Sequence, residues 1–223
     1  AAGAVTTTVT GGGGAGDNIT FTSTVDDASN DTTLDLVGGA SGNVDIQGNV
    51  GGSNAVGAFR VESSPQVDLQ NITAENDIDV TGTNIDLNST TYTSNTGSLT
   101  FTGDVDLAGA GTTTVTASDM SGAGNITVNA VISNAAGAST SLELKAINSI
   151  IFNNGAVIES TNNALNVSMI ADIDGDGAGG IEMQSNTLID TLGGDVVMQA
   201  SDGIFMDSGA TIQTGGGNID IVN

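Results

Sequence analysis

One segment of the sequence has residue types and spacing that indicate a specific chemistry, the run DIDGDG that begins at Asp172. It places Asp172, Asp174 and Asp176 at alternate positions, and Glu182 follows a few residues later. Carboxylates spaced in this way wrap their oxygens around Ca²⁺ in EF-hand loops. The EF-hand pattern has a bidentate glutamate at its twelfth position, where this chain has Met183, so Glu182 is the available substitute. We therefore expect Ca²⁺ to bind Asp172, Asp174, Asp176 and Glu182, with a flexible acidic surface loop as the alternative.

Composition excludes several other kinds of chemistry. The 223 residues include 26 acidic and two basic side chains, Arg60 and Lys145, so the net charge is −24. Such a charge repels nucleic acid and anionic membrane surfaces. There is no histidine and no cysteine, which removes the usual catalytic triads, zinc sites and disulfides. Two carboxylates can hydrolyse a glycosidic bond, but there is no Trp and only one Tyr to bind a sugar ring. We therefore expect no enzymatic activity.

The sequence also lacks the features of membrane and secretion segments. It has no apolar run of 18 residues and no basic region followed by a short apolar one. We expect no membrane insertion, and we expect any export signal to lie outside this segment or to have been removed.

The chain consists of two related halves, residues 1–106 and 107–223. The sequence TTTVT occurs at residues 6–10 and again at residues 112–116. Further pairs keep nearly the same offset: Ile19 with Ile126, Leu34 with Leu142, Val44 with Ile150, and Phe59 with Leu165. Units that repeat in series are typical of solenoids, in which each unit stacks on its neighbour. We interpret the halves as two tandem super-repeats of one continuous solenoid, itself a slice of a longer array.

The second half carries a loop insertion near residues 172–179. Five residues separate Val61 from Val67, whereas thirteen separate the equivalent Val167 and Ile181. The extra residues have the size and composition of DIDGDGAG. Adding three aspartates to a strongly negative chain is unfavourable unless a cation binds there. The insertion therefore supports the expected Ca²⁺ site.

Short triplets of the form apolar-x-apolar recur along both halves. A period of two over three to five residues predicts strands, and the Gly-rich and Asn-rich stretches between them predict corners. Strands this short, in a chain with 3% aromatic residues, favour a coil in which aliphatic side chains of successive turns stack about 4.8 Å apart. The sequence therefore predicts an all-β fold, a right-handed parallel β-helix.

The spacing of equivalent triplets predicts the length of each turn. Ile19, Val44 and Val67 are 25 and 23 residues apart, and the spacings from Ile126 to Ile150 and from Ile150 to Ile181 are 24 and 31. We expect one rung between successive members, hence about five rungs in each half and about ten in all. A group of asparagines stands directly before strands, where side-chain amides could hydrogen-bond from rung to rung or simply favour left-handed turns: Asn18, Asn43, Asn84, Asn125 and Asn218.

The middle residue of each triplet should point away from the core. In the first half it is often aspartate, and we interpret these carboxylates as solvated surface rather than as a metal-binding or mineral-binding face. In the second half, Asp45, Asp79 and Asp86 are replaced by Ile151, Val197 and Phe205. Outward apolar side chains predict a contact face, beneath the inserted loop or against another rod. A shifted register that turns them inward is the alternative.

Three phrases carry a resemblance to a known family: DNITFTSTV, NDIDVTGTNIDL and GSLTFTGDVDL. They resemble the shaft repeats of large bacterial adhesins related to filamentous haemagglutinin, over essentially the whole chain. The resemblance implies a right-handed parallel β-helix exported to the bacterial cell surface. Adhesins of this kind usually carry an N-terminal secretion domain that caps the helix, and this sequence has no segment that matches one. We therefore expect an interior segment, or a cap supplied by a neighbouring subunit.

Two functions remain open. The first is a structural shaft or filament segment of an extracellular bacterial surface fibre, which associates with itself end to end or laterally, or continues into flanking repeats of the same chain. The second is a ligand-binding adhesin module whose loops recognise a host, matrix or carbohydrate partner. Exposed aromatic residues would be expected in the second case, and Tyr92 is the residue that the sequence offers. We favour the shaft.

Overall fold

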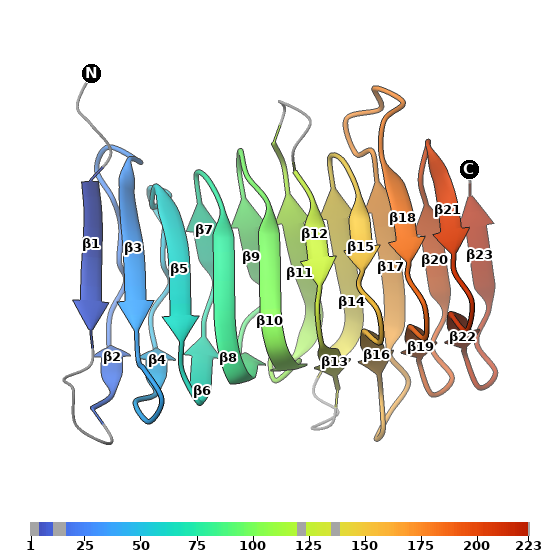
Figure 1. Ribbon diagram of the computed structural model, residues 1–223, viewed down its shortest axis with the longest axis horizontal. Coiled ribbons are helices and arrows are strands. Elements are labelled where there is room, and N and C mark those ends of the chain that lie inside the picture. Colours follow the sequence, from blue (N-terminus) through green and yellow to red (C-terminus); the bar gives the residue numbers. More distant parts are fainter. Residues whose placement is uncertain (1–4, 11–16, 120–123, 135–138, 223) are drawn as a thin grey trace.

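The computed structural model describes residues 5–10, 17–119, 124–134 and 139–222, and in these residues the fold is a parallel β-solenoid without helices (Figure 1). Every pairing between its strands is parallel, and strands that follow one another in a ladder are about one turn apart in the sequence. The predicted all-β class and the stacked parallel strands are therefore confirmed.

Each turn contributes to three ladders, which we call the first, second and third faces. The first face contains β1 (Val5–Thr10), β3 (Thr32–Val37), β5 (Ala58–Ser63), the beginnings of β8 (Ile78–Leu87) and β10 (Leu99–Asp106), β12 (Ile126–Val128), β15 (Ile150–Phe152), β18 (Gly180–Met183) and β21 (Gly203–Met206). The second face contains β2 (Ile19–Phe21), β4 (Val44–Ile46), β6 (Gln66–Leu69), the ends of β8 and β10, β13 (Val131–Ser133), β16 (Val157–Glu159), β19 (Leu188–Asp190) and β22 (Thr211–Gln213).

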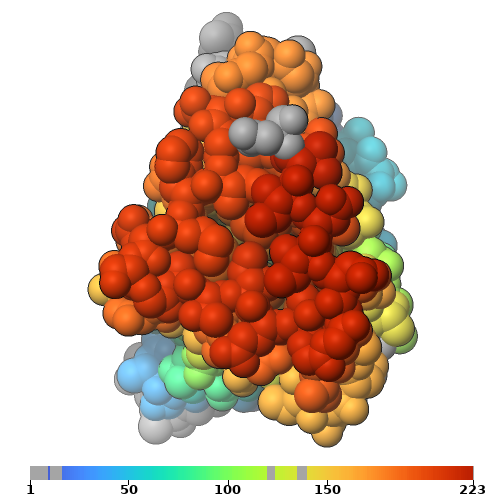
Figure 2. Space-filling view, turned by 90° about the vertical axis from the view of Figure 1, so that its right-hand side faces the viewer, coloured from blue at the N-terminus to red at the C-terminus, as the bar shows by residue number. Residues whose placement is uncertain are grey.

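The third face is a separate sheet. It contains β7 (Ile72–Ala74), β9 (Thr91–Ser94), β11 (Gly111–Ala117), β14 (Ser139–Ala146), β17 (Asn166–Ala171), β20 (Val196–Gln199) and β23 (Ile219–Val222). Isolated bridges at Val25 and Val50 extend it into the two earlier turns. The molecule seen from its C-terminal end has a roughly triangular outline (Figure 2).

The spacing of the turns agrees with the sequence, and their number is slightly lower. Val44 pairs with both Ile19 and Val67, and Ile150 pairs with both Ile126 and Ile181, so each predicted interval is one turn. Nine described strands stack on the first face, which makes about eight turns rather than ten. The difference arises because some turns are long, such as the one between the paired residues Ile150 and Ile181. At about 4.8 Å per turn the rod is about 40 Å long.

The core is a stack of aliphatic side chains inside the three faces. In most strands buried and partly exposed residues alternate, as in Val44–Ile46 and Ile150–Phe152. The largest fully buried side chains include Tyr92, Phe59 and Phe152, and the others are Leu and Ile. Because each inward residue packs on its equivalent one turn away, the core needs no large aromatic cluster.

Side-chain oxygens at the corners connect successive turns. Asn18 accepts a hydrogen bond from the backbone N–H of Asn43 (2.9 Å), and Asn125 accepts one from Ser149 (3.0 Å). On the third face, Asn166 accepts from the N–H of Asp195 (2.9 Å). The predicted rung-to-rung bonding of asparagines is therefore confirmed at Asn18 and Asn125, with a backbone N–H as the donor in both cases.

The same contact recurs with other polar residues in the same corners. The Asp195 carboxylate accepts a hydrogen bond from the N–H of Asn218 (2.7 Å), and Asp77 accepts one from Ser98 (2.9 Å). Such bonds satisfy N–H groups that the change of strand direction would otherwise leave without partners. They also favour one alignment between neighbouring turns.

The two super-repeats do not occupy equivalent faces. The segment 6–10 lies in β1 on the first face, whereas its counterpart 112–116 lies in β11 on the third. Likewise β2 on the second face corresponds to β12 on the first, and β4 on the second face corresponds to β15 on the first. The repeat therefore spans four full turns and two further faces, whereas about five whole turns were expected. As a result, the second copy is displaced around the rod by one face relative to the first.

Candidate functional site

The predicted acidic insertion forms a projecting corner loop between β17 and β18 (Figure 1). It connects the third face to the first, within the turn that separates Ile150 from Ile181. Asp172 begins the loop with a φ of 63°, and Gly175 and Gly177 follow with φ of 72° and 88°. This left-handed backbone is readily adopted by glycine and is also found for aspartate, which explains why these residue types form the loop.

Three of the four predicted calcium ligands come together in this loop. One carboxylate oxygen from each of Asp172, Asp174 and Asp176 lies within 4.8 Å of the others. The Asp172 carboxylate also accepts hydrogen bonds from the N–H groups of Asp176 (2.9 Å) and Gly177 (3.1 Å). These oxygens are hard ligands of the kind that Ca²⁺ takes, and backbone carbonyls and water would have to complete its six to eight contacts.

The electrostatics of the loop differ between neighbouring aspartates. A hydrogen bond from the Ser201 side chain, together with the backbone N–H groups, lowers the pKa of Asp172. Desolvation, the shared hydrogen bond with Asp172 and the charge of Asp176 raise the pKa of Asp174. The surroundings thus favour the ionised form of Asp172 and disfavour the ionised form of Asp174. A bound cation would relieve the repulsion between these carboxylates.

The fourth predicted ligand, Glu182, does not belong to this group. It is the middle residue of β18 and points outward from the first face, where it is exposed. Its neighbours in register are Ile151 on one side and Phe205 on the other. Strand alternation fixes this direction, because the flanking Ile181 and Met183 are buried in the core.

The three residues of the predicted contact face all point outward, so their register is not shifted. Ile151 and Val197 are partly exposed and Phe205 is largely exposed, while their neighbours Ile150, Phe152, Val196 and Met198 are buried. However, Ile151 and Phe205 lie on the first face and Val197 lies on the third. They therefore do not form one contact face. The displacement between the two super-repeats distributes these counterparts over two faces of the rod.

The second face carries a continuous column of carboxylates. Asp45, Asp68, Asp86 and Asp106 pair in register on four successive turns. Partial burial, a hydrogen bond with Asp68 and the charges of Asp68 and Asp106 raise the pKa of Asp86 to about 6. One oxygen of Asp106, Oδ1, is buried and has no hydrogen-bond partner.

Both cations of the chain pair with acids elsewhere. Arg60 lies 3.8 Å from Asp79 on the first face, and Lys145 lies 2.6 Å from Glu143 on the third. Among the described residues, no basic side chain therefore neutralises the acidic column. The column is a surface of repelling charges that only protons or dissolved cations can compensate.

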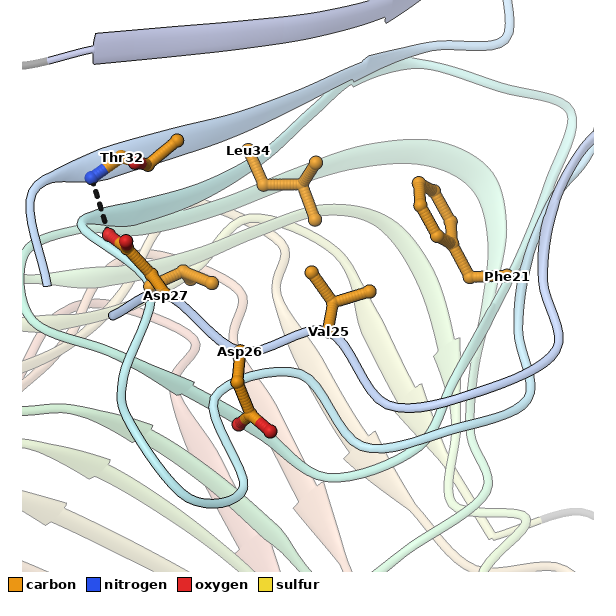
Figure 3. A pocket seen from close by; sticks show the side chains of 7 residues that line it. Phe21, Val25, Asp26, Asp27, Thr32 and Leu34 are labelled. Atoms are coloured by element: carbon orange, nitrogen blue, oxygen red, sulfur yellow. Dashed lines mark hydrogen bonds between the residues drawn. The ribbon is translucent and has the colours of Figure 1, made fainter. Parts of the chain in front are cut away.

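An apolar cavity of about 250 Å³ lies near the N-terminal end (Figure 3). Its described lining includes Phe21, Val25 and Leu34, and two carboxylates, Asp26 and Asp27, stand at its edge. Asp27 accepts hydrogen bonds from the N–H groups of Asp31 (2.8 Å) and Thr32 (2.7 Å), and the bond from Thr32 is the main reason that its pKa is lowered.

Asp26 similarly accepts hydrogen bonds from the N–H groups of Ser53 (2.8 Å) and Asn54 (3.3 Å) in the next turn. Both carboxylates are thus engaged in holding corner loops.

Tyr92, which the sequence offered as an exposed recognition residue, is fully buried. Its hydroxyl donates a hydrogen bond to the Leu69 carbonyl (3.2 Å) and accepts one from the Ser89 N–H (3.2 Å). Burial raises its pKa well above the usual range. Tyr92 is therefore a core residue, and not the exposed aromatic residue that the binding-module alternative needs.

Comparison with protein-family models, with curated proteins and with solved structures gives no match for this chain. In the residues that the structure describes, there is no helix with the length and hydrophobicity needed to span a membrane. The interpretation of function therefore depends on the fold and on the surfaces described above.

Proposed function

We propose that this chain is a structural shaft segment of an extracellular fibre on a bacterial surface. The observation that carries this proposal is the stacking of successive turns along the rod, from β1 to β21 on the first face, β2 to β22 on the second and β7 to β23 on the third. Corner side chains reinforce the stacking by bonding one turn to the next. Such a rod resists bending and keeps its two ends at a fixed separation, which is what a spacer requires.

The proposal includes association along the rod axis, through flanking repeats or a second copy. Ile219 and Ile221 continue the buried column formed by Val196 and Met198, yet they are 47% and 55% exposed in the last turn. One further turn would bury these side chains and pair the open strand β23. The carboxylate loop would add a Ca²⁺ site to the same turn as β17 and β18.

The alternative, a ligand-binding adhesin module, has less support. Its expected aromatic residue, Tyr92, is part of the core. The projecting loop is acidic and carries no aromatic side chain. The shaft therefore remains the better proposal.

Small-angle X-ray scattering of the purified chain at several concentrations tests the shaft. We expect rods about 40 Å long that lengthen in whole multiples as concentration rises, with constant cross-section. Samples with millimolar Ca²⁺ and with chelator, at matched ionic strength, separate a calcium requirement from charge screening.

The variant Ile221→Asp places a charge in the exposed core of the last turn and should stop the lengthening. Asp220→Asn alters an outward side chain of the same strand and serves as the control. Single rods at every concentration, or growth in width, would contradict axial association of separate chains.

A further inference from the structure

Phe205 is exposed in a chain whose other aromatic side chains lie mainly in the core. Its exposed fraction is 53%, whereas Phe59, Tyr92, Phe101 and Phe152 are buried. It stands at an outward position of β21, the last described strand of the first face, where the inward residue Met206 is also exposed. Both the direction of the side chain and the open edge of the sheet therefore expose the ring. A large apolar ring held in water is unfavourable unless it has a partner.

The Phe205 ring lies against the backbone of two glycines. Gly180 and Gly203 pair in register. A Cβ atom added at Gly180 would lie 3.6 Å from the nearest ring atom of Phe205, and one added at Gly203 would lie 3.3 Å from it. Gly203 has a φ of 111°, which other residues rarely adopt. The absence of both side chains gives the ring a flat support on one side and leaves much of the rest of it open to solvent.

Two carboxylates flank this ring. Glu182 is the in-register neighbour of Phe205 on the preceding turn, and Asp207 follows two residues later in the chain. With Gln184 and Met183, these residues line a hollow of about 190 Å³. Within the described part of the chain, neither carboxylate forms a side-chain hydrogen bond or ion pair, and both are exposed. The hollow thus combines an aromatic surface with two uncompensated negative charges.

This combination fits an organic cation. An aromatic ring attracts a cation through the negative potential of its face, and carboxylates accept hydrogen bonds from an ammonium group. A hydrated metal ion would bind mainly through the carboxylates, because hard metal ions prefer oxygen ligands to the face of a ring. The net charge of −24 would also draw a basic partner toward the rod.

We infer that the hollow formed by Glu182, Phe205 and Asp207 binds an alkylammonium group, the lysine side chain of a basic partner protein. The methylene stem would lie across the ring, while the ammonium group would lie between the two carboxylates. This recognition is additional to the proposed shaft, because it uses outward side chains and requires no association between rods.

NMR titration of the chain with N-acetyl-lysine methylamide tests the inference. We expect saturable shifts at the amide signals of Gly180 and Gly203 and at the Phe205 ring, with a dissociation constant of about 10 mM, as is typical of one weak contact. The uncharged analogue N-acetyl-norleucine methylamide has the same stem and should give no saturable shift.

Two variants separate the contributions of the ring and the charge. Phe205→Leu keeps an apolar side chain and should weaken binding about fivefold, and Glu182→Gln should weaken it by a similar factor. Asp220→Asn removes one charge from the third face and should leave binding unchanged. Unaltered spectra elsewhere establish that each variant is folded.

Three results would overturn the inference. These are equal binding by wild type and Phe205→Leu, shifts that concentrate on the Asp45 to Asp106 column, and the absence of saturation at 50 mM, about five times the expected dissociation constant. Each would mean that lysine meets only a diffuse negative surface.

Discussion

Asp86 shows how the environment of a single residue sets the response of the rod to pH. It lies between Asp68 and Asp106 in the acidic column, and its pKa is raised to about 6. A carboxyl group whose pKa is higher in the folded state than in the unfolded state opposes folding when it is ionised. Its cost is therefore present above pH 6 and disappears as the pH falls from about 6 to about 4.

We expect the free energy of unfolding to increase on mild acidification from pH 7.5 to pH 5. Asp86→Asn should stabilise the chain at pH 7.5 by about 1 kcal/mol, a value reduced for solvent screening of a partly exposed group, and should have little effect at pH 4.5. Urea unfolding at constant ionic strength measures both values. The control Asp220→Asn removes the same charge beside the uncharged Val197. If both variants changed stability equally, net charge rather than the column would be responsible.

Strict alternation in the sequence already indicates the direction of two side chains, Glu182 and Tyr92, to which a binding role was assigned. Ile181-Glu182-Met183 is itself an apolar-x-apolar triplet, so its outward Glu182 could have been separated from the calcium group. Thr91-Tyr92-Thr93 is the inverse pattern, and the same rule places Tyr92 in the core. The support of Phe205 by glycines could not be read from the sequence, because Gly180 and Gly203 meet only through the pairing of β18 with β21.

Among the elements, the loop between β17 and β18 brings three aspartate carboxylates close together. If Ca²⁺ binds the three aspartates, it offsets the repulsion that raises the pKa of Asp174. Ligands that bind only the folded state stabilise it by mass action. The stabilisation is about 2.7 kcal/mol when the free ligand concentration is 100 times the dissociation constant.

We therefore expect millimolar Ca²⁺ to raise the thermal midpoint of the wild type by several degrees. Asp174→Asn should abolish this shift, while Glu182→Gln should retain it because Glu182 lies outside the group. Asp202→Asn is the control for loss of one nearby charge. Differential scanning fluorimetry with a solvatochromic dye provides the measurement. A calcium shift that survives Asp174→Asn would contradict the site.

The bend in β10 depends on a glycine. Gly103 has a φ of 122° and packs so closely on Gly82 in β8 that a Cβ there would overlap the Gly82 carbonyl oxygen. At this point both strands pass from the first face to the second.

We expect Gly103→Ala to destabilise the chain by at least about 3 kcal/mol, because it adds a steric clash to an unfavourable φ. Gly216→Ala has a comparable positive φ of 136° with open space around the new Cβ, and should cost only the backbone strain, about 1 to 2 kcal/mol. Urea unfolding followed by circular dichroism measures the difference. Similar losses in the two variants would show that the backbone angle, and not the close contact, matters.

For the whole molecule, the sequence predicted the class of fold and the length of individual turns. It did so because apolar residues recur with period two and because equivalent triplets such as Ile19 and Val44 are in fact paired. It could not predict that a turn has three faces, since apolar triplets look alike on every face. Consequently it placed Ile151, Val197 and Phe205 on one surface, although the pairing of their strands puts them on two.

The displacement between the super-repeats has a mechanical consequence. Each copy spans four turns and two further faces. In a tandem array successive copies are therefore rotated by one third of a revolution, and the original orientation returns after every three copies. A bulky corner loop or a charged column, if each copy carried it, would wind around such a fibre instead of accumulating along one side. Asymmetric forces from these features would cancel over three copies, which would keep a long fibre straight, and any attachment point would be presented in three directions around it.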